Sequence, residues 1–256
     1  MSELLNLFKN SENFSTKHIK YFDAYERLLE KFRGKDVTFV EIGVLNGGSL
    51  DVWKEYFSKK SRIIGIDLNP QCKKFQKDNI EIYIGSQSDQ DFWKSFFDKV
   101  GPVDIVIDDG GHTNIQQIMT AINCIPNINN NGVLIVEDTH TSYMKKFNNP
   151  SNHSFINFAK KEIDDINSTF PGLPKMEFSL NKYVYSLEFF ESIVAFKIDQ
   201  KKCVENYIIK NEGKFHNIKD FRHNEKSALL LVLLRYKFIR YFIEKFNELK
   251  LMKYFK

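Results

Sequence analysis

The apolar positions of this chain change their period repeatedly along the sequence. Short runs rich in β-branched residues predict strands at 37–42, 62–67, 80–85, 103–107 and 133–136. Apolar residues at three- and four-residue steps predict intervening helices at 16–32, from 47 onward, and at 92–100, 114–125 and 155–166. Strands that alternate with helices in this way are typical of an α/β fold built on a doubly wound parallel sheet.

Two further apolar runs lie close together near the end of this pattern. Residues 182–190 and 192–198 are joined by a tight turn and predict a terminal antiparallel hairpin. The expected fold is therefore a Rossmann-like seven-stranded sheet that ends in this hairpin, with an N-terminal helix and a C-terminal helical extension. The corresponding segments are 1–35, 36–200 and 201–256.

The predicted N-terminal helix is amphipathic. Ser15 or Thr16 is a suitable N-cap, and Gly34 lies just past its end, while residues 1–14 are polar and weakly patterned. Lys17, His18 and Tyr21 fall in the first turns, where we expect surface positions unless the helix covers a site at the sheet edge.

The C-terminal extension has a different character from the rest of the chain. Residues 226–256 carry eight Lys and Arg and two Glu, and a Leu/Phe face predicts a helix or a helix pair. Such a helix can pack on the main domain or on a second subunit. A basic amphipathic helix also suits the surface of an anionic membrane. Its most apolar run, 228–234, is far too short to span a bilayer.

Composition narrows the class of protein. Hydrophobic residues make up 42% and charged residues 27%, which is ordinary for a globular protein. The net charge of +4 gives no reason to expect a nucleic-acid partner. Cys72, Cys124 and Cys203 are too few and too widely spaced for a disulfide framework or a zinc site, so reduced thiols and a cytoplasmic location are expected. Residues 1–6 lack the pattern of a signal peptide.

The first two predicted strands carry the pattern of a nucleotide-binding βαβ unit. The first strand runs into Glu41 and Gly43, and Gly47-Gly48-Ser49 opens the following helix. The spacing is not G-x-G-x-x-G, which disfavours NAD and FAD. Asp67 ends the second strand at a spacing from Gly43 that suits a ribose-binding acid, although it could simply cap the following turn.

Paired acids follow the fourth and fifth predicted strands. The stretch 103–112 reads as a buried strand followed by Asp108, Asp109, a glycine turn and His112, and Glu137-Asp138 follows the fifth strand. Neighbouring parallel strands deliver their carboxyl ends to one rim, so four carboxylates are expected close together. Such a cluster requires compensation, and a hard divalent cation such as Mg²⁺ supplies it most economically. A solvated turn is the alternative for Asp108-Asp-Gly-Gly alone.

Together these motifs resemble class I S-adenosylmethionine-dependent methyltransferases, and more narrowly the metal-dependent sugar O-methyltransferases of the macrocin and mycinamicin type. The resemblance spans about residues 16–200. Its motifs are Glu41-Ile-Gly43 with Gly47-Gly48-Ser49, Gly65-Ile-Asp67, Gly85-Ser-Gln-Ser-Asp89, Asp108-Asp-Gly-Gly-His112 and Glu137-Asp-Thr-His-Thr-Ser-Tyr143. Two positions depart from the family pattern: Ser86 stands where an acid is frequent, and Thr139 where leucine is frequent.

The resemblance implies a role for each motif. S-adenosylmethionine would be bound by Glu41, Gly43, Asp67, Ser86, Gln87 and Asp108. Mg²⁺ would be bound by Asp109, Glu137 and Asp138, with His112 as general base. The implied reaction is O-methylation of a sugar hydroxyl, on a nucleotide-linked sugar, a capsule or surface-glycan precursor, or a natural product. A methyltransferase for a phosphorylated or amine metabolite and a non-catalytic cofactor-binding module remain alternatives.

Overall fold

The computed structural model describes residues 3–218 and 235–252. The chain divides into two compact units, Met1–Tyr207 and Ile208–Lys256. The first unit contains the predicted sheet and all of the predicted site residues.

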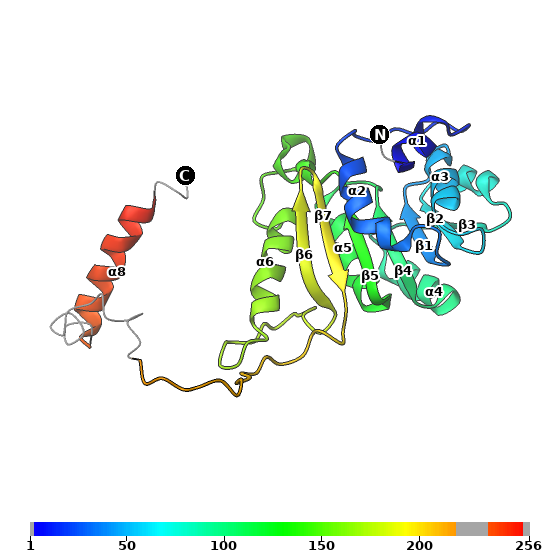
Figure 1. Ribbon diagram of the computed structural model, residues 1–256. Helices are drawn as coiled ribbons and strands as arrows, with labels where there is room; N and C mark the ends of the chain where they lie inside the picture. The colour runs from blue at the N-terminus through cyan, green and yellow to red at the C-terminus, as the bar shows by residue number, and fades with distance from the viewer. Residues whose placement is uncertain (1–2, 219–234, 253–256) are drawn as a thin grey trace. The chain divides into compact units, whose positions relative to one another are not determined.

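One mixed sheet of seven strands organises the first unit (Figure 1). Its order is β3-β2-β1-β4-β5-β7-β6, with parallel pairing from β3 to β5 and antiparallel pairing of β7 with both β5 and β6. The strands are β1 Thr38–Ile42, β2 Arg62–Asp67, β3 Ile80–Ile84, β4 Val103–Asp108, β5 Ile128–Val136, β6 Val184–Phe190 and β7 Ile193–Ile198. The sequence prediction of a doubly wound, seven-stranded α/β fold ending in an antiparallel hairpin is confirmed.

The helices cover both faces of this sheet because successive strand residues point to opposite sides. Phe39 and Ile63 belong to a core formed with α1, α2 and α3, whereas the next residues, Val40 and Ile64, belong to a core formed with α4, α5 and α6. The helices are α1 Glu3–Lys9, α2 Tyr21–Leu29, α3 Gly48–Tyr56, α4 Gln90–Val100, α5 Asn114–Cys124 and α6 Phe155–Asn167. Short 3₁₀ turns occur at Glu30–Phe32, Pro70–Phe75, Ile125–Asn127, Thr139–Tyr143 and Lys145–Phe147.

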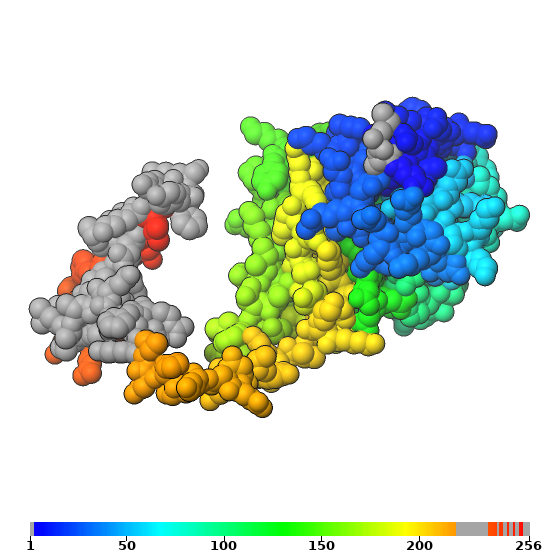
Figure 2. All heavy atoms as spheres, viewed as in Figure 1, coloured from blue at the N-terminus to red at the C-terminus, as the bar shows by residue number. Residues whose placement is uncertain are grey.

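The N-terminal region differs from the sequence prediction in two respects. The first residues form α1, which packs through the fully buried Leu4 into the same core as the sheet. In Figure 2 this dark blue segment lies against the rest of the first unit. The helix expected to begin at Ser15 or Thr16 begins instead at Tyr21, and Lys20 at its N-cap makes no side-chain capping bond. Residues 11–20 thus form neither helix nor strand and end in a turn at Ile19–Lys20; this segment is the strap 11–20.

The fifth strand begins before its predicted start at Val133, because Asn129–Gly132 are also part of it. These residues belong to β5, which begins at Ile128, and they lie where the register between β4 and β5 shifts. Asn131 has a positive φ of 65°, a conformation that asparagine tolerates better than most residues. The polar run is therefore an irregular start of the strand, which a search for apolar periodicity misses.

The second unit contains α8, Lys237–Leu251. Its described aromatic side chains Phe238, Tyr241 and Phe242 are exposed. The helix predicted within 226–256 is thus confirmed over these residues, whereas its apolar run at 228–234 lies outside the described residues. Among the residues that the structure describes, we find no helix whose length and apolarity would let it cross a membrane.

Gly43 occupies the junction between β1 and β4, where the strand order of the sheet reverses. It has a φ of +95°, and a Cβ added there would lie 2.1 Å from the carbonyl oxygen of Asp109. Gly34 offers a matched control, since it also has a positive φ of +66° but a Cβ added there would meet no atom within 4 Å. We expect Gly34→Ala to lower the free energy of unfolding by about 1 kcal/mol and Gly43→Ala by about 3 kcal/mol or more. Urea denaturation of both variants measures the difference; equal losses would mean that the junction has room for a side chain.

Glu162 on α6 is buried, and its Oε2 atom has no hydrogen-bond partner among the described residues. Burial, with a contribution from Asp165, raises the pKa of this carboxyl to about 7. The folded state keeps this proton up to about pH 7, whereas the unfolded chain releases it near pH 4.3. The free energy of unfolding should therefore fall as pH rises between these values, by on the order of 2 kcal/mol. Denaturation across this range should show that Glu162→Gln removes the decline and that Glu177→Gln, at an exposed position, does not.

Candidate ligand and metal site at the sheet switch point

The sheet brings the ends of β1, β4 and β5 together at one rim. The ladder continues one residue past each strand: Gly43 N donates to Ile66 O at 2.8 Å, Asp109 N to Ile42 O at 3.0 Å, and Glu137 N to Asp108 O at 2.9 Å. The strand order reverses between β1 and β4, which is the position where open α/β sheets bind ligands.

A pocket of about 640 Å³ opens at this rim. One side follows the glycine turn after β1 and the ends of β2 and β3, and the other follows the acids after β4 and β5. The strap 11–20 contributes a further wall. Site residues predicted from the sequence that line the pocket are Gly43, Asp67, Ser86, Gln87, Asp109, His112, Glu137 and Asp138.

Asp67 fixes the glycine turn. Its Oδ2 atom accepts hydrogen bonds from Val44 N at 2.8 Å and Leu45 N at 3.2 Å, and Oδ1 accepts one from Asn69 N at 2.8 Å. A carboxylate has about four acceptor positions, so capacity remains on the pocket side. Asp67 therefore holds the turn in shape and can still accept from a ligand.

Asp108 lies behind the pocket wall rather than on it. Its carboxylate is fully buried, and Gln87 Nε2 donates to both oxygens at 2.9 and 3.0 Å. Burial raises the pKa of Asp108. The Gln87 side chain also accepts from Gly111 N at 2.8 Å, so the pair fixes the glycine turn before His112. In this structure Asp108 supports the wall, and Gln87 joins the two sides of the pocket.

Glu41 is the second predicted residue that lies behind the wall. It is fully buried, and its carboxylate accepts hydrogen bonds from Ser49 Oγ at 2.6 Å and from Lys17 Nζ at 3.3 Å. The Lys17 ammonium also contacts Asp109 Oδ2 at 2.7 Å and Glu137 Oε2 at 3.0 Å. The Lys17 side chain is only 4% exposed, so the alternative in which this region covers a site at the sheet edge holds for Lys17. Three carboxylates draw this side chain inward because they would otherwise be buried without a counter-ion.

The pKa values in this cluster reflect burial opposed by charge. Burial raises the pKa of Glu137, while the Lys17 ammonium and the hydrogen bond donated by the Tyr25 hydroxyl oppose this rise. Burial likewise raises the pKa of Glu41, again opposed by Lys17. Burial acts to lower the pKa of Lys17, but the surrounding acids outweigh it, and the pKa lies well above its usual value. Lys17 therefore carries its charge at neutral pH.

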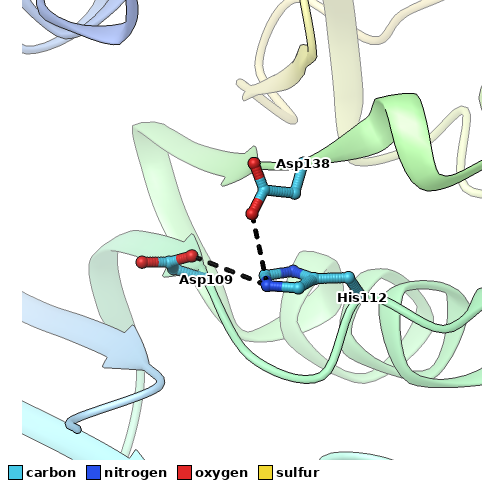
Figure 3. Close-up of side chains that lie close together, drawn as sticks. All are labelled: Asp109, His112 and Asp138. Atoms are coloured by element: carbon cyan, nitrogen blue, oxygen red, sulfur yellow. Dashed lines mark ion pairs between the residues drawn. The ribbon is translucent and has the colours of Figure 1, made fainter. Parts of the chain in front are cut away.

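Asp109, His112 and Asp138 form the more accessible part of the site (Figure 3). His112 Nε2 lies 3.2 Å from Asp138 Oδ2 and 3.9 Å from Asp109 Oδ1. One ligand atom from each residue can be chosen so that all three lie within 4.8 Å of one another. Oxygen and imidazole donors at this separation suit a divalent cation.

Hydrogen bonds from neighbouring residues hold two members of this group in strained backbone conformations. His112 and Asp138 both have left-handed φ values, 57° and 54°. Thr141 Oγ1 donates to the carbonyl of His112 at 2.9 Å, and the hydroxyl of Tyr21 donates to Asp138 Oδ1. Unfavourable conformations of this kind cost about 1–3 kcal/mol each and persist where the surroundings fix them.

Three residues that complete the site belong to none of the sequence motifs. Lys17, Tyr21 and Tyr25 all reach the acids from the N-terminal region. The signal that could have indicated them was the excess of acids over cations at the rim. An excess of charge shows that compensation is needed but does not show which residue supplies it.

Comparison with protein-family models finds no match. The chain is 32% identical over 156 residues to the 8-demethyl-8-alpha-L-rhamnosyl tetracenomycin-C 2'-O-methyltransferase of Streptomyces olivaceus, covering 57% of this chain and 41% of that protein. It is 33% identical over 132 residues to the mycinamicin VI 2''-O-methyltransferase of Micromonospora griseorubida, covering 48% of this chain and 32% of that protein. These alignments cover less than half the length of the curated relatives.

A solved structure of a methyltransferase is also similar to this chain. The MycE methyltransferase of the mycinamycin biosynthetic pathway, in complex with Mg, SAH and mycinamycin VI, superposes with a TM-score of 0.67 and 26% sequence identity. The match covers 77% of this chain and 53% of that one. The chain is therefore similar in sequence to part of these O-methyltransferases and shares its fold with MycE.

Proposed function

We propose that this chain is an S-adenosylmethionine-dependent, Mg²⁺-assisted O-methyltransferase acting on a sugar hydroxyl. The observation that carries the proposal is one pocket that joins a glycine turn and a strand-end acid on one side to Asp109, His112 and Asp138 on the other. The first side suits a nucleoside, and the second suits activation of a hydroxyl. The curated relatives, named as sugar O-methyltransferases, support the same assignment.

The cofactor would lie along the ends of β1, β2 and β3. Gly43 leaves space for close approach of the backbone, and Asp67 offers its remaining acceptor capacity to the ribose hydroxyls. Ser86 and Gln87, after β3, would border the adenine. Glu41 and Asp108 would act from behind the wall, by fixing Lys17 and Gln87.

The donor set fits a divalent cation. Asp109 and Asp138 present partly exposed carboxylates, and Glu137, although fully buried, is among the residues that line the pocket. These three residues would hold Mg²⁺, and Glu137 would do so by exchanging its contact with Lys17. The cation supplies Lewis acidity that makes an acceptor hydroxyl easier to deprotonate.

His112 would remove the proton. Its Nε2 atom faces the pocket, and Asp138 Oδ2 at 3.2 Å would stabilise the imidazolium that forms. Tyr21 holds the other oxygen of Asp138, so the carboxylate keeps its orientation. The methyl group needs in-line placement because the sulfonium leaving group is already activated, and the pocket walls would supply that placement.

The proposal also covers the chemical class of the acceptor. A capsule or surface-glycan precursor, a nucleotide-linked sugar and the sugar of a natural product all present hydroxyls that suit this chemistry. Phosphorylated and amine acceptors are less favoured, because the curated relatives are named as O-methyltransferases, one of them for a rhamnosyl compound. Contact of α8 with a membrane surface or with a second copy of the chain is a secondary proposal, which the exposed aromatic residues of this helix support.

Metal dependence tests the activity directly. With labelled S-adenosylmethionine and a panel of nucleotide sugars and deoxysugar glycosides, excess chelator should abolish methyl transfer and Mg²⁺ should restore it. Calorimetry should show that binding of S-adenosylhomocysteine survives the chelator, since the cofactor residues lie on the other side of the pocket. Undiminished methyl transfer in excess chelator would rule out a role for the metal. Methyl transfer only to amine or phosphorylated acceptors would assign the chain to a methyltransferase for those metabolites instead.

His112→Gln tests the proton transfer. Glutamine can hydrogen-bond but is a poor base, so kcat should fall by about 10²–10⁴ while cofactor affinity and thermal stability stay near wild type. His153→Gln, at an exposed position outside the pocket, is the matched control and should leave kcat unchanged. A near wild-type kcat for His112→Gln would assign His112 a structural role.

A further inference from the structure

Lys17 already occupies the position of a cation at the acid cluster. Its Nζ lies 2.7 Å from Asp109 Oδ2, and 3.2 and 3.0 Å from the two oxygens of Glu137. Glu137 also accepts from the hydroxyl of Tyr25, so both of its oxygens are engaged. While Lys17 stays in place, it occupies acceptor positions on Glu137 and on Asp109 Oδ2 that a metal ion would need.

Asp109 is shared between the two halves of the site. Oδ2 contacts Lys17, whereas Oδ1 faces His112 at 3.9 Å. A divalent cation held by Asp109 and Asp138 would therefore lie near the Lys17 ammonium. Two like charges separated by a single carboxylate repel each other strongly in a poorly solvated pocket.

The strap 11–20 that carries Lys17 is anchored mainly before this residue. Ser11 Oγ donates to Gly48 O at 3.3 Å, and Asn13 Nδ2 donates to Asp51 Oδ2 at 2.8 Å. Between these anchors and α2, Phe14 and His18 are exposed. The acids are thus what holds the middle of the strap inward.

We propose that Lys17 is a built-in counter-ion that competes with the divalent cation for Asp109 and Glu137 and thereby sets the metal affinity of the site. The inference rests on the metal site of the proposed function. Lys17 compensates the buried acids when no metal is bound, and it gives up these contacts when the metal enters. It is a positioning residue rather than a catalytic one.

Mn²⁺ binding to the full-length protein, followed by electron paramagnetic resonance of the free ion, tests this competition. Lys17→Met keeps the apolar stem but removes the charge, and we expect Mn²⁺ to bind about tenfold more tightly or better. Lys17→Gln, which can still hydrogen-bond the carboxylates, should also tighten binding and serves as the second variant if Met impairs folding. Lys17→Arg keeps the charge and should stay close to wild type.

Lys20→Met is the matched control, because Lys20 is exposed and pairs with Glu191 instead. It should leave Mn²⁺ affinity unchanged. If wild type binds Mn²⁺ and both uncharged variants bind it equally or more weakly, the competition is refuted while the metal site stands. If neither wild type nor the variants bind Mn²⁺, the metal site and this inference both fail.

Discussion

Buried negative charge at the ends of β1, β4 and β5 is the constraint on which the rest of the site depends. Glu41 and Glu137 are fully buried and Asp109 lies beside them, all within contact of one ammonium group. An uncompensated buried charge costs several kcal/mol, so this arrangement cannot persist without a cation. Lys17 supplies it from the strap 11–20, which precedes the start of α2 at Tyr21. The N-terminal segment is therefore part of the site as well as part of the fold.

The sheet register explains why the acids meet at all. Ile42 pairs with Asp108, and Asp108 pairs with Val136, so the next residues along each strand fall side by side at the rim. Gly43 sits where β1 and β4 diverge, and only a residue without a side chain lets Asp109 approach so closely. A shift of one position would turn the acids to the opposite face of the sheet and would separate them from the pocket.

The sequence was sufficient for features that depend on local pattern. The strands follow from β-branched runs whose ends carry the polar residues, and the pairing of the Asp109 and Asp138 regions follows from the crossover rule. Lys17 could not be found in this way, because its partners Glu41, Asp109 and Glu137 lie 24, 92 and 120 residues away. The late start of α2 was missed for the same reason, since tertiary charge pairing outweighed local helix periodicity. The role of Asp108 behind the wall depends on its bond to Gln87, which no spacing rule indicates.

The two halves of the site differ in how firmly they are held. His112 and Asp138 have strained backbones fixed by Thr141 and Tyr21, so their mutual distance is set by the fold. Lys17 instead reaches its partners through a long side chain with many rotamers, and an ammonium can leave without breaking the backbone around it. Proton transfer needs the fixed geometry, because small displacements cost large factors in rate. Charge compensation tolerates exchange, because any cation at the cluster satisfies the buried acids. The two halves of the site differ because the backbone strain lies at His112 and Asp138. This pair is rigid, whereas the Lys17 counter-ion is replaceable.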